Sequence, residues 1–468
     1  MAQKTGHIAA LEAERQLFAA EMRLWRGVRG LSQRQLAART HDSNSLIGRV
    51  ETAERSPSRE LAQRLDAVLE TDGAFVRIWR RIERELEVQA DQVGVDPQLG
   101  LVWGRTPAST VETVSHLWRA DMDRRQVIIG SAWAAAAFVD PSRRWFADAI
   151  DTDTSHSGVR RIGSSEVEVM WSMARAFADA DHHLGGGYAR RTLLDFMNTT
   201  VAPILNGTYD TRTGRELLTA AARLTGLGAF MCFDSAHQGL AQRYYIQALR
   251  MAKAAGARAL GAHILADMSM QAYELQQPGE ALALAEAGHR AARDCGSPST
   301  AARCSMLSAR AHGLAGDAAA AAHAISQAER ELTHADLPDE PFWIRFFNEE
   351  QLAAELMYTA HDLGQAVQVQ QHAPIVLKSA AGMQRREVLA ATTLAASYLP
   401  GDRGRDVEVD VDRACKILGD ALPAAAGLTS ARGLASINAV RRRLASYSDR
   451  PAVQQVEADF REFAGATA

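Results

Sequence analysis

Apolar residues recur every three to four positions along most of this chain, which is the period of an amphipathic helix. Near the start, Leu36 and Ala37 are spaced to pack on a preceding helix, and Ser32 is placed to cap their helix through its hydroxyl group. The polar stretch Thr40-His41-Asp42 then interrupts the pattern. The pattern therefore predicts a short helix after Ser32, followed by a tight turn.

Two more short helices are predicted after this turn. Ser43 is placed to cap a helix whose apolar positions are Leu46, Ile47 and Val50, and Ser58 opens another with leucines along one face. The second helix of the pair begins with small polar residues at its exposed end. Helix, tight turn and helix of this kind is the geometry that enters a DNA major groove.

The spacing of these residues resembles that of lambda-repressor-like (Cro/cI, or xenobiotic-response-element) helix-turn-helix domains. The resemblance covers about the first 80 residues and runs without gaps. The residues that carry it are Leu31, Ser32, Gln33, Leu36, Ala37, Ser43, Ser45, Ile47, Arg49, Val50, Glu51, Arg55, Pro57 and Ser58. The resemblance implies double-stranded DNA as the partner.

Taken position by position, the resemblance also implies which side chains meet DNA. Those facing bases or phosphates are Gln33, Ser43, Asn44, Ser45 and Gly48, with Arg49 near the sugar-phosphate backbone. An asparagine pairs with adenine, whereas a serine reads either base weakly. Arg34 is assigned to phosphates, and so are Arg39, Arg55 and Arg59.

The sequence departs from the family pattern at the turn. Thr40, His41 and Asp42 stand where an apolar residue, a glycine and another apolar residue are usual, and Ala53 replaces a glycine after the recognition helix. His and Asp tolerate left-handed backbone better than most residues, so the turn can still form. We expect the missing apolar residue to loosen the recognition helix and weaken DNA binding. The alternative is a degenerate three-helix module used for protein contact.

Charge is consistent with a DNA-binding amino end. Between Arg15 and Arg64 there are ten arginines against five acidic residues, whereas the whole chain has a net charge of −4. A basic segment on an acidic body supplies local phosphate neutralisation. The alternative, an arginine-rich surface that contacts only solvent, would show the same numbers of arginines and acidic residues. The isoelectric point of the whole chain is near neutrality, which excludes a polycation that binds nucleic acid indiscriminately.

The remaining composition predicts an all-α protein. The 468 residues are rich in Ala, Leu, Arg, Glu and Gln, and only 6% are aromatic. This length accommodates two or more domains. The four cysteines lack metal-ligand spacing and fall in helical patterns, as expected for buried thiols of a reducing cytoplasm. They are Cys232, Cys295, Cys304 and Cys415.

The second half of the chain repeats. Gly239, Gly279, Gly316 and Gly364 each lie between two helical patterns, at spacings of 40, 37 and 48 residues. This resembles tetratricopeptide repeats, whose period is about 34. Small residues occur where the paired helices must approach, and the longest spacing contains an aromatic insertion at 334–347. We therefore expect an α-solenoid of helical hairpins with a concave face.

The whole arrangement resembles a group of actinobacterial regulators with a repressor-like head and a tetratricopeptide-like body. Three further segments carry this resemblance, at 120–125, 184–191 and 239–245. We expect a helix-turn-helix DNA-binding domain at 1–90, a linker with connecting helices at 91–163, and the repeat domain at 164–468. The connecting helices contain Trp118, Trp133 and Trp145, as either a helical hairpin or part of a dimer seam.

Several clusters resemble enzyme sites but are better explained otherwise. Asp179, Asp181, His182 and His183 precede a glycine triplet at 185–187, which suggests a metal site or a helix start that holds an anion with Arg190 and Arg191. Consecutive histidines point in different directions, and no strand precedes the glycines. A glycine-capped helix break explains the pattern. With no other catalytic motif, we expect no enzyme, no metal and no cofactor.

A ligand groove is expected on the concave face, if the first helix of each pair lines it. Its polar candidates are as likely to be an ordinary solvated surface, and the effector-binding residues stay unassigned. The candidates are His263, Asp267, Met270, Gln271, Asn348, Gln351 and Glu355.

No membrane partner is expected. Arg124-Arg125 before the apolar run 127–139 imitates an export signal, but it lies deep inside the chain and the run is too short to span a bilayer. A buried linker helix explains it better.

Together these features predict a cytoplasmic, homodimeric, sequence-specific transcriptional regulator, with repression as its expected output. Its repeat domain would dimerise and sense a peptide, small-molecule or protein effector. The alternative is a protein-interaction adaptor with a vestigial DNA-binding head.

Overall fold

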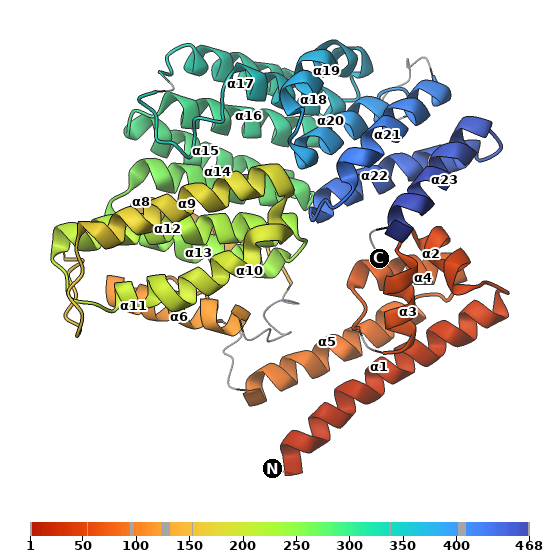
Figure 1. Cartoon of the computed structure of the whole chain (residues 1–468), viewed down its shortest axis with the longest axis horizontal. Coiled ribbons are helices and arrows are strands. Elements are labelled where there is room, and N and C mark those ends of the chain that lie inside the picture. Colours follow the sequence, from red (N-terminus) through yellow and green to blue (C-terminus); the bar gives the residue numbers. More distant parts are fainter. Residues whose placement is uncertain are drawn as a thin grey trace. The chain divides into compact units, whose positions relative to one another are not determined.

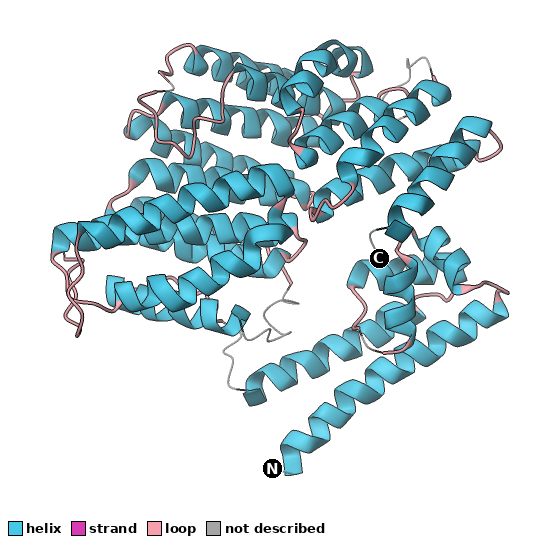
Figure 2. Ribbon diagram, in the orientation of Figure 1, coloured by secondary structure: helices cyan, strands magenta, loops and turns pink. Residues whose placement is uncertain are grey.

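The computed structural model describes residues 2–53, 55–93, 98–122, 132–151, 153–336, 338–400 and 409–466 (Figure 1). Helices dominate this part of the chain (Figure 2), where the only strand-like pairing is two isolated bridges, His156 to Tyr209 and Arg161 to Thr208. The predicted all-α class is confirmed. The segment Arg124-Arg125 lies outside the described residues.

The chain divides into two compact units. The first comprises Met1–Pro97 and Arg461–Ala468, and the second comprises Gln98–Phe460. The helices of the first unit are α1 (Ala2–Val28), α2 (Gln33–Thr40), α3 (Asn44–Glu51), α4 (Arg59–Leu69) and α5 (Ala74–Val93).

One apolar core holds the helices of the first unit together. It contains Phe18 and Met22 from α1, Leu36 from α2, and Ile47 from α3, with leucines of α4 and aromatic and aliphatic residues of α5. Phe18 meets Phe75 edge to face, with ring centroids 5.1 Å apart. The apolar positions predicted for the three short helices lie in this core, except Leu46, which is half-buried and packs against it.

Serine side chains fix where these three helices begin. The Ser32 hydroxyl accepts from the Gln35 amide at 3.2 Å, and the Gln35 side chain accepts from the Ser32 amide at 2.8 Å, which forms a capping box. Ser43 and Ser58 cap α3 and α4 in the same way, each at 3.1 Å. The three predicted caps are confirmed.

The second unit begins with helices that precede the hairpins. These are α6 (Pro107–Met122), α8 (Ala136–Ala147), α9 (Ser164–Leu184), α10 (Gly186–Phe196), a π-helical turn (Met197–Val201) and α11 (Ala202–Leu205).

A run of helical hairpins follows, and the first helices of successive hairpins pack on one another (Figure 1). The hairpins are α12 (Thr211–Asp234) with α13 (Gln238–Ala255), α14 (Arg258–Glu274) with α15 (Pro278–Asp294), α16 (Pro298–Ala315) with α17 (Ala318–Leu332), α18 (Glu349–Asp362) with α19 (Ala366–Ala380), and α20 (Gln384–Ala396) with α21 (Val411–Ala425). The last helices are α22 (Ala431–Leu444) and α23 (Pro451–Ala466).

The glycines that mark the repeats do not all form the turns. Gly316 and Gly364 adopt left-handed backbone between their helices, at φ +84° and +73°. Gly239 and Gly279 instead lie inside α13 and α15, and the left-handed residues of those turns are Ala236 and Gln276. Glycine spacing therefore located the hairpins without locating every turn residue.

Two tryptophans of the connecting segment, Trp118 and Trp145, are core residues of the second unit. Trp118 on α6 is fully buried, and Trp145 on α8 packs over the bare backbone of Gly261 in α14, where a Cβ would come within 2.0 Å of its ring. Burial within one chain removes both side chains from any dimer seam. Trp118 and Trp145 therefore pack within the chain, whereas Trp133 is half-buried.

Helix α12 is apolar and long enough to cross a bilayer by length and composition, and it is the one such helix among the described residues. Most of that stretch, 83%, is buried against neighbouring helices. A buried core helix has the same composition, and α12 occupies that position between α9, α10 and α13.

Candidate DNA-binding surface

The start of α3 presents the small polar residues that were assigned to DNA. Ser43, Asn44 and Ser45 are exposed, while Ile47 and Val50 on the opposite face are buried in the core. The Ser43 hydroxyl is also the cap of this helix, so its oxygen already accepts the Leu46 amide. α3 therefore offers one polar face at an accessible amino end, where backbone amides and the helix dipole favour a phosphate.

Gln33 lies at the start of α2 and is held by α3. Its Nε2 donates to Oε2 of Glu51 at 2.6 Å. The buried Glu51 carboxylate also accepts from Arg26 of α1, at 2.6 Å from Nε, and Arg23 donates to the Glu51 carbonyl. One carboxylate therefore joins the first three helices and fixes where the Gln33 amide points.

The atypical turn between α2 and α3 is well packed. Thr40 is fully buried, and its hydroxyl donates to the Leu36 carbonyl at 3.1 Å. His41 adopts left-handed backbone at φ +56°, as its tolerance for that region allows. Asp42 accepts two hydrogen bonds from Arg64 of α4, at 2.7 and 3.2 Å. Thr40 and Asp42 thus replace the apolar contacts with polar ones, so the turn itself shows no gap that would loosen α3.

Two small residues shape the far part of the recognition helix. Ala53 adopts left-handed backbone at φ +60°, in the place where a glycine is usual. Gly48 lies in the middle of α3, where a Cβ would meet no atom within 4 Å. The fold therefore does not require glycine at 48, and its effect is to leave the helix surface open to a close approach.

The arginine side chains around this face differ in how much they contact the rest of the domain. Arg34, Arg39, Arg49 and Arg55 are all exposed. Arg59 packs over the Trp79 ring, with its guanidinium carbon 5.9 Å from the ring centroid. The first four extend into solvent next to α2 and α3, as phosphate-contacting side chains do.

Sequence reasoning missed the residues that support this surface. Arg26 and Arg64 were counted only as charge, yet each holds an acidic residue of the α2–α3 region in place. Glu51 was quoted in the motif without a role. Its position at the end of an apolar helical face, where it must be buried, was the available signal.

The comparison with protein families agrees with this geometry. Residues 17–77 match the family model of a helix-turn-helix domain. That span contains α2, α3 and α4 and extends into α1 and α5. No curated protein and no solved structure matches the chain. The chain thus carries a helix-turn-helix domain, which suggests a DNA-binding regulator.

The glycine triplet does not leave an open anion site. α9 ends at a left-handed Gly185, and the Gly186 amide at the start of α10 donates to the Asp234 carboxylate at 2.9 Å. Arg190 donates to Asp121 at 2.5 and 2.7 Å, and Asp181 is bound by Arg385. The anions that these groups bind are therefore carboxylates of the chain itself. No cluster able to hold a metal ion occurs among the described residues.

Most polar candidates for a concave groove are already engaged. His263, Asp267 and Gln271 are buried, and Asp267 accepts from Arg303 at 2.5 Å. Gln271 donates to the Gln238 carbonyl. In α18, Asn348 caps the helix while Gln351 donates to Glu355, and Met270 is only half-buried. These positions form an interior network more than a solvated face.

The cysteines are free thiols, and three of the four are buried. Burial raises the pKa of Cys232 and that of Cys304 to about 12. Both are therefore protonated near neutral pH and act as packing residues, whereas Cys295 is half-buried.

Proposed function

We propose that this protein is a sequence-specific, DNA-binding transcriptional regulator that acts in the cytoplasm. The observation that carries the proposal is the exposed polar amino end of α3, set on a rigid three-helix scaffold by serine caps and by Glu51. Asn44 and Gln33 are the side chains able to pair with a base, and Arg34 and Arg49 hold phosphates. Ser43, Ser45 and Gly48 line the same approach.

The regulator acts as a homodimer in this proposal. A single helix-turn-helix domain makes few base contacts, whereas two domains read half-sites separated by one or more helical turns. The hairpin run supplies the dimer contact and senses a peptide, small-molecule or protein effector. An effector that changes the relation between the two heads alters operator affinity without touching DNA.

The test is DNA binding by the full-length protein. Sites recovered by genome-wide mapping of bound DNA are titrated with wild type and with the double variant Gln33→Ala, Asn44→Ala. We expect the double variant to lose at least tenfold in affinity for the recovered site, and wild-type affinity to fall steeply with salt.

The control is Gln63→Ala, which removes an exposed glutamine from α4, outside the proposed face. Its affinity should equal that of wild type. Equal binding by wild type and the double variant would reject the proposal, and would favour an adaptor whose working part is the hairpin run.

A further inference from the structure

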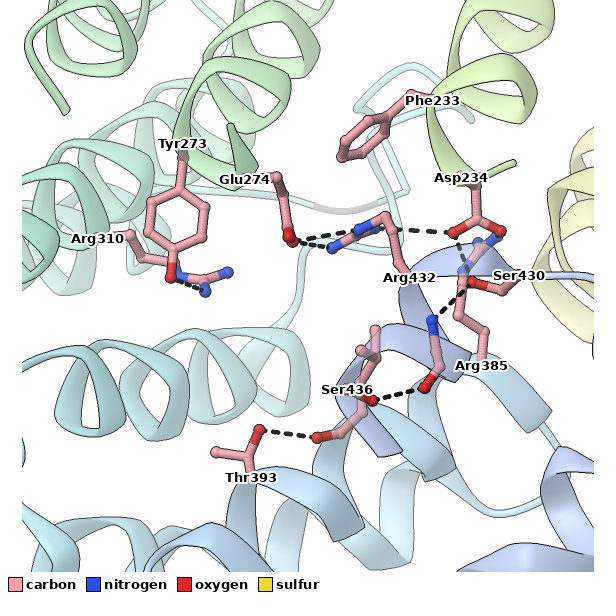
Figure 3. Close-up of polar contacts among 12 residues, drawn as sticks. Phe233, Asp234, Tyr273, Glu274, Arg310, Arg385, Thr393, Ser430, Arg432 and Ser436 are labelled. Atoms are coloured by element: carbon pink, nitrogen blue, oxygen red, sulfur yellow. Dashed lines mark hydrogen bonds and ion pairs between the residues drawn. The ribbon is translucent and has the colours of Figure 1, made fainter. Parts of the chain in front are cut away.

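The hairpin run buries a set of arginines, and most of them are paired with acidic residues. Arg303 pairs with Asp267 at 2.5 Å, and Arg385 pairs with Asp181 at 2.8 Å and with Asp234 at 3.1 Å. Arg432 donates to Glu274 and approaches Asp234, as Figure 3 shows. Arg310 meets Glu355, Asp362 and the Tyr273 hydroxyl. These cations are compensated inside the protein.

Arg223 of α12 is the exception. It is 7% exposed, its Nε atom is fully enclosed without an acceptor, and no described residue forms an ion pair or hydrogen bond with its guanidinium. The acids whose charge acts on it most are Asp267 and Asp181. Both are already bound by Arg303 and Arg385. Arg223 is therefore a buried cation whose nearest anions serve other partners.

A second buried donor in the same region also lacks an acceptor. The Tyr245 hydroxyl of α13 is enclosed with no hydrogen-bond partner, and it acts on the charge of Arg223. Both of these donors lack a hydrogen-bond acceptor, and an acceptor-only group supplies one. An oxyanion is such a group, and it also supplies the missing negative charge.

The energetics favour an external partner over an empty site. Burial lowers the pKa of Arg223, but a guanidinium does not lose its proton in proteins. It stays charged, and an uncompensated buried charge costs far more than a paired one. Natural cores rarely keep such a group unless it has a ligand to bind.

His182, Phe346 and Arg303 form one contact cluster, and Arg223 interacts electrostatically with His182 and Arg303. His182 of α9, whose pKa the Arg223 charge helps to lower, has an exposed side chain. Its ring meets the half-buried Phe346 edge to face, with ring centroids 6.1 Å apart, and the Arg303 guanidinium lies over the Phe346 ring, 5.4 Å from the ring centroid. Arg223 itself keeps 7% of its surface exposed, so it is not completely enclosed.

We propose that Arg223 anchors a binding site, inside the hairpin run, for a small molecule that carries an oxyanion, either a carboxylate or a phosphate. Arg223 donates to the oxyanion, Arg303 adds a second positive charge, and the rings of His182 and Phe346 cover the rest of the molecule. The site does not depend on DNA binding, and it stands if the helix-turn-helix domain proves to have another role.

The test measures melting temperature and binding in the full-length chain. Inorganic phosphate and succinate are the two probes, each added at constant ionic strength against chloride. We expect at least one to raise the melting temperature of wild type by about 2 °C at concentrations well above its Kd. In Arg223→Met, calorimetric affinity for that probe should fall at least tenfold. The probe that binds identifies which oxyanion the site prefers.

The variants also test the empty site without any ligand. Removing an unpaired buried charge stabilises a fold, so Arg223→Met should melt at or above the wild-type temperature in chloride alone. Arg303→Met, the matched control, orphans Asp267 and should melt lower. The proposal is wrong if neither probe affects wild type, if either acts equally on Arg223→Met, or if Arg223→Met melts as low as the control.

Discussion

The Gln33 amide donates a 2.6 Å hydrogen bond to the buried carboxylate of Glu51, from the first turn of α2 to the last turn of α3. A side chain assigned to DNA is thus held by the end of the recognition helix itself. The same carboxylate binds Arg26, so the orientation of Gln33 and the packing of α1 share one group. If Gln33 contacts DNA as proposed, this carboxylate couples DNA recognition to the stability of the domain.

Glu51→Ala should therefore affect both properties. Loss of the carboxylate removes the acceptor of the Gln33 amide and of two Arg26 nitrogen atoms. We expect it to destabilise the helix-turn-helix domain by about 2–3 kcal/mol. Hydrogen exchange of the α3 amides measures this loss directly, because these amides belong to the first unit and report on its unfolding. Gln33→Ala, which leaves the Arg26 pair intact, should cost less than 1.5 kcal/mol, roughly the value of one hydrogen bond. Equal protection of α3 in Glu51→Ala and wild type would contradict the coupling.

Gly48→Ala distinguishes the effect of this position on domain stability from its effect on DNA affinity. A Cβ at this position meets nothing, and alanine is a better helix former, so we expect the variant to stabilise the domain by about 0.5–1 kcal/mol. If DNA approaches this surface closely, the same methyl group weakens binding to the operator. Hydrogen exchange and DNA titration measure the two effects.

Gly27→Ala is the matched control for this change. Gly27 lies in α1, and a Cβ there also meets no atom within 4 Å. It should raise stability and leave DNA affinity as in wild type. A Gly48→Ala protein that binds DNA as tightly as Gly27→Ala would place the interface elsewhere.

Gly261→Ala tests whether α8 is part of the hairpin unit. The added methyl would overlap the Trp145 ring, so the tryptophan must leave its position on α14. We expect a loss of about 1–3 kcal/mol, the usual cost of overpacking. Urea denaturation of the second unit measures it. In Gly226→Ala on α12 the nearest atom is 3.7 Å away, so that variant should be at least as stable as wild type. Similar stability of the two variants would mean that Trp145 moves freely.

His361 makes the second unit sensitive to acid. Burial, together with Arg443 and Arg310, lowers its pKa to about 4. The unfolded chain binds this proton near pH 6.5 and the folded chain does not, so stability is present above that pH and is lost as pH falls toward 4. The loss from this group amounts to at most about 3 kcal/mol.

His361→Gln removes the titrating group. Urea denaturation at pH 7 and at pH 4.5 should show a smaller loss on acidification than in wild type. An identical loss in both proteins would show that His361 does not stay neutral in the fold.

Local pattern predicted the first unit well because its signals are local. Ser32, Ser43 and Ser58 cap helices within three residues, and the apolar positions of α2 and α3 follow the helical period. The same holds for the hairpins, whose helices show the expected period. Turn residues were harder to predict from the sequence, because Ala236 and Gln276 occupy left-handed positions where a glycine is usual.

The sequence alone therefore determined the all-α class, the helix-turn-helix and the succession of hairpins, because helical periodicity and capping act over a few residues. Only the tertiary structure decided which charges pair. Arg385 and Asp181 are 204 residues apart, and so the partner of each buried arginine depends on how distant helices pack. The same packing decided that Gln33 meets Glu51 and that Arg223 forms no ion pair with any residue that the structure describes. The compensation of a buried charge depends on its surroundings and not on its neighbours in sequence.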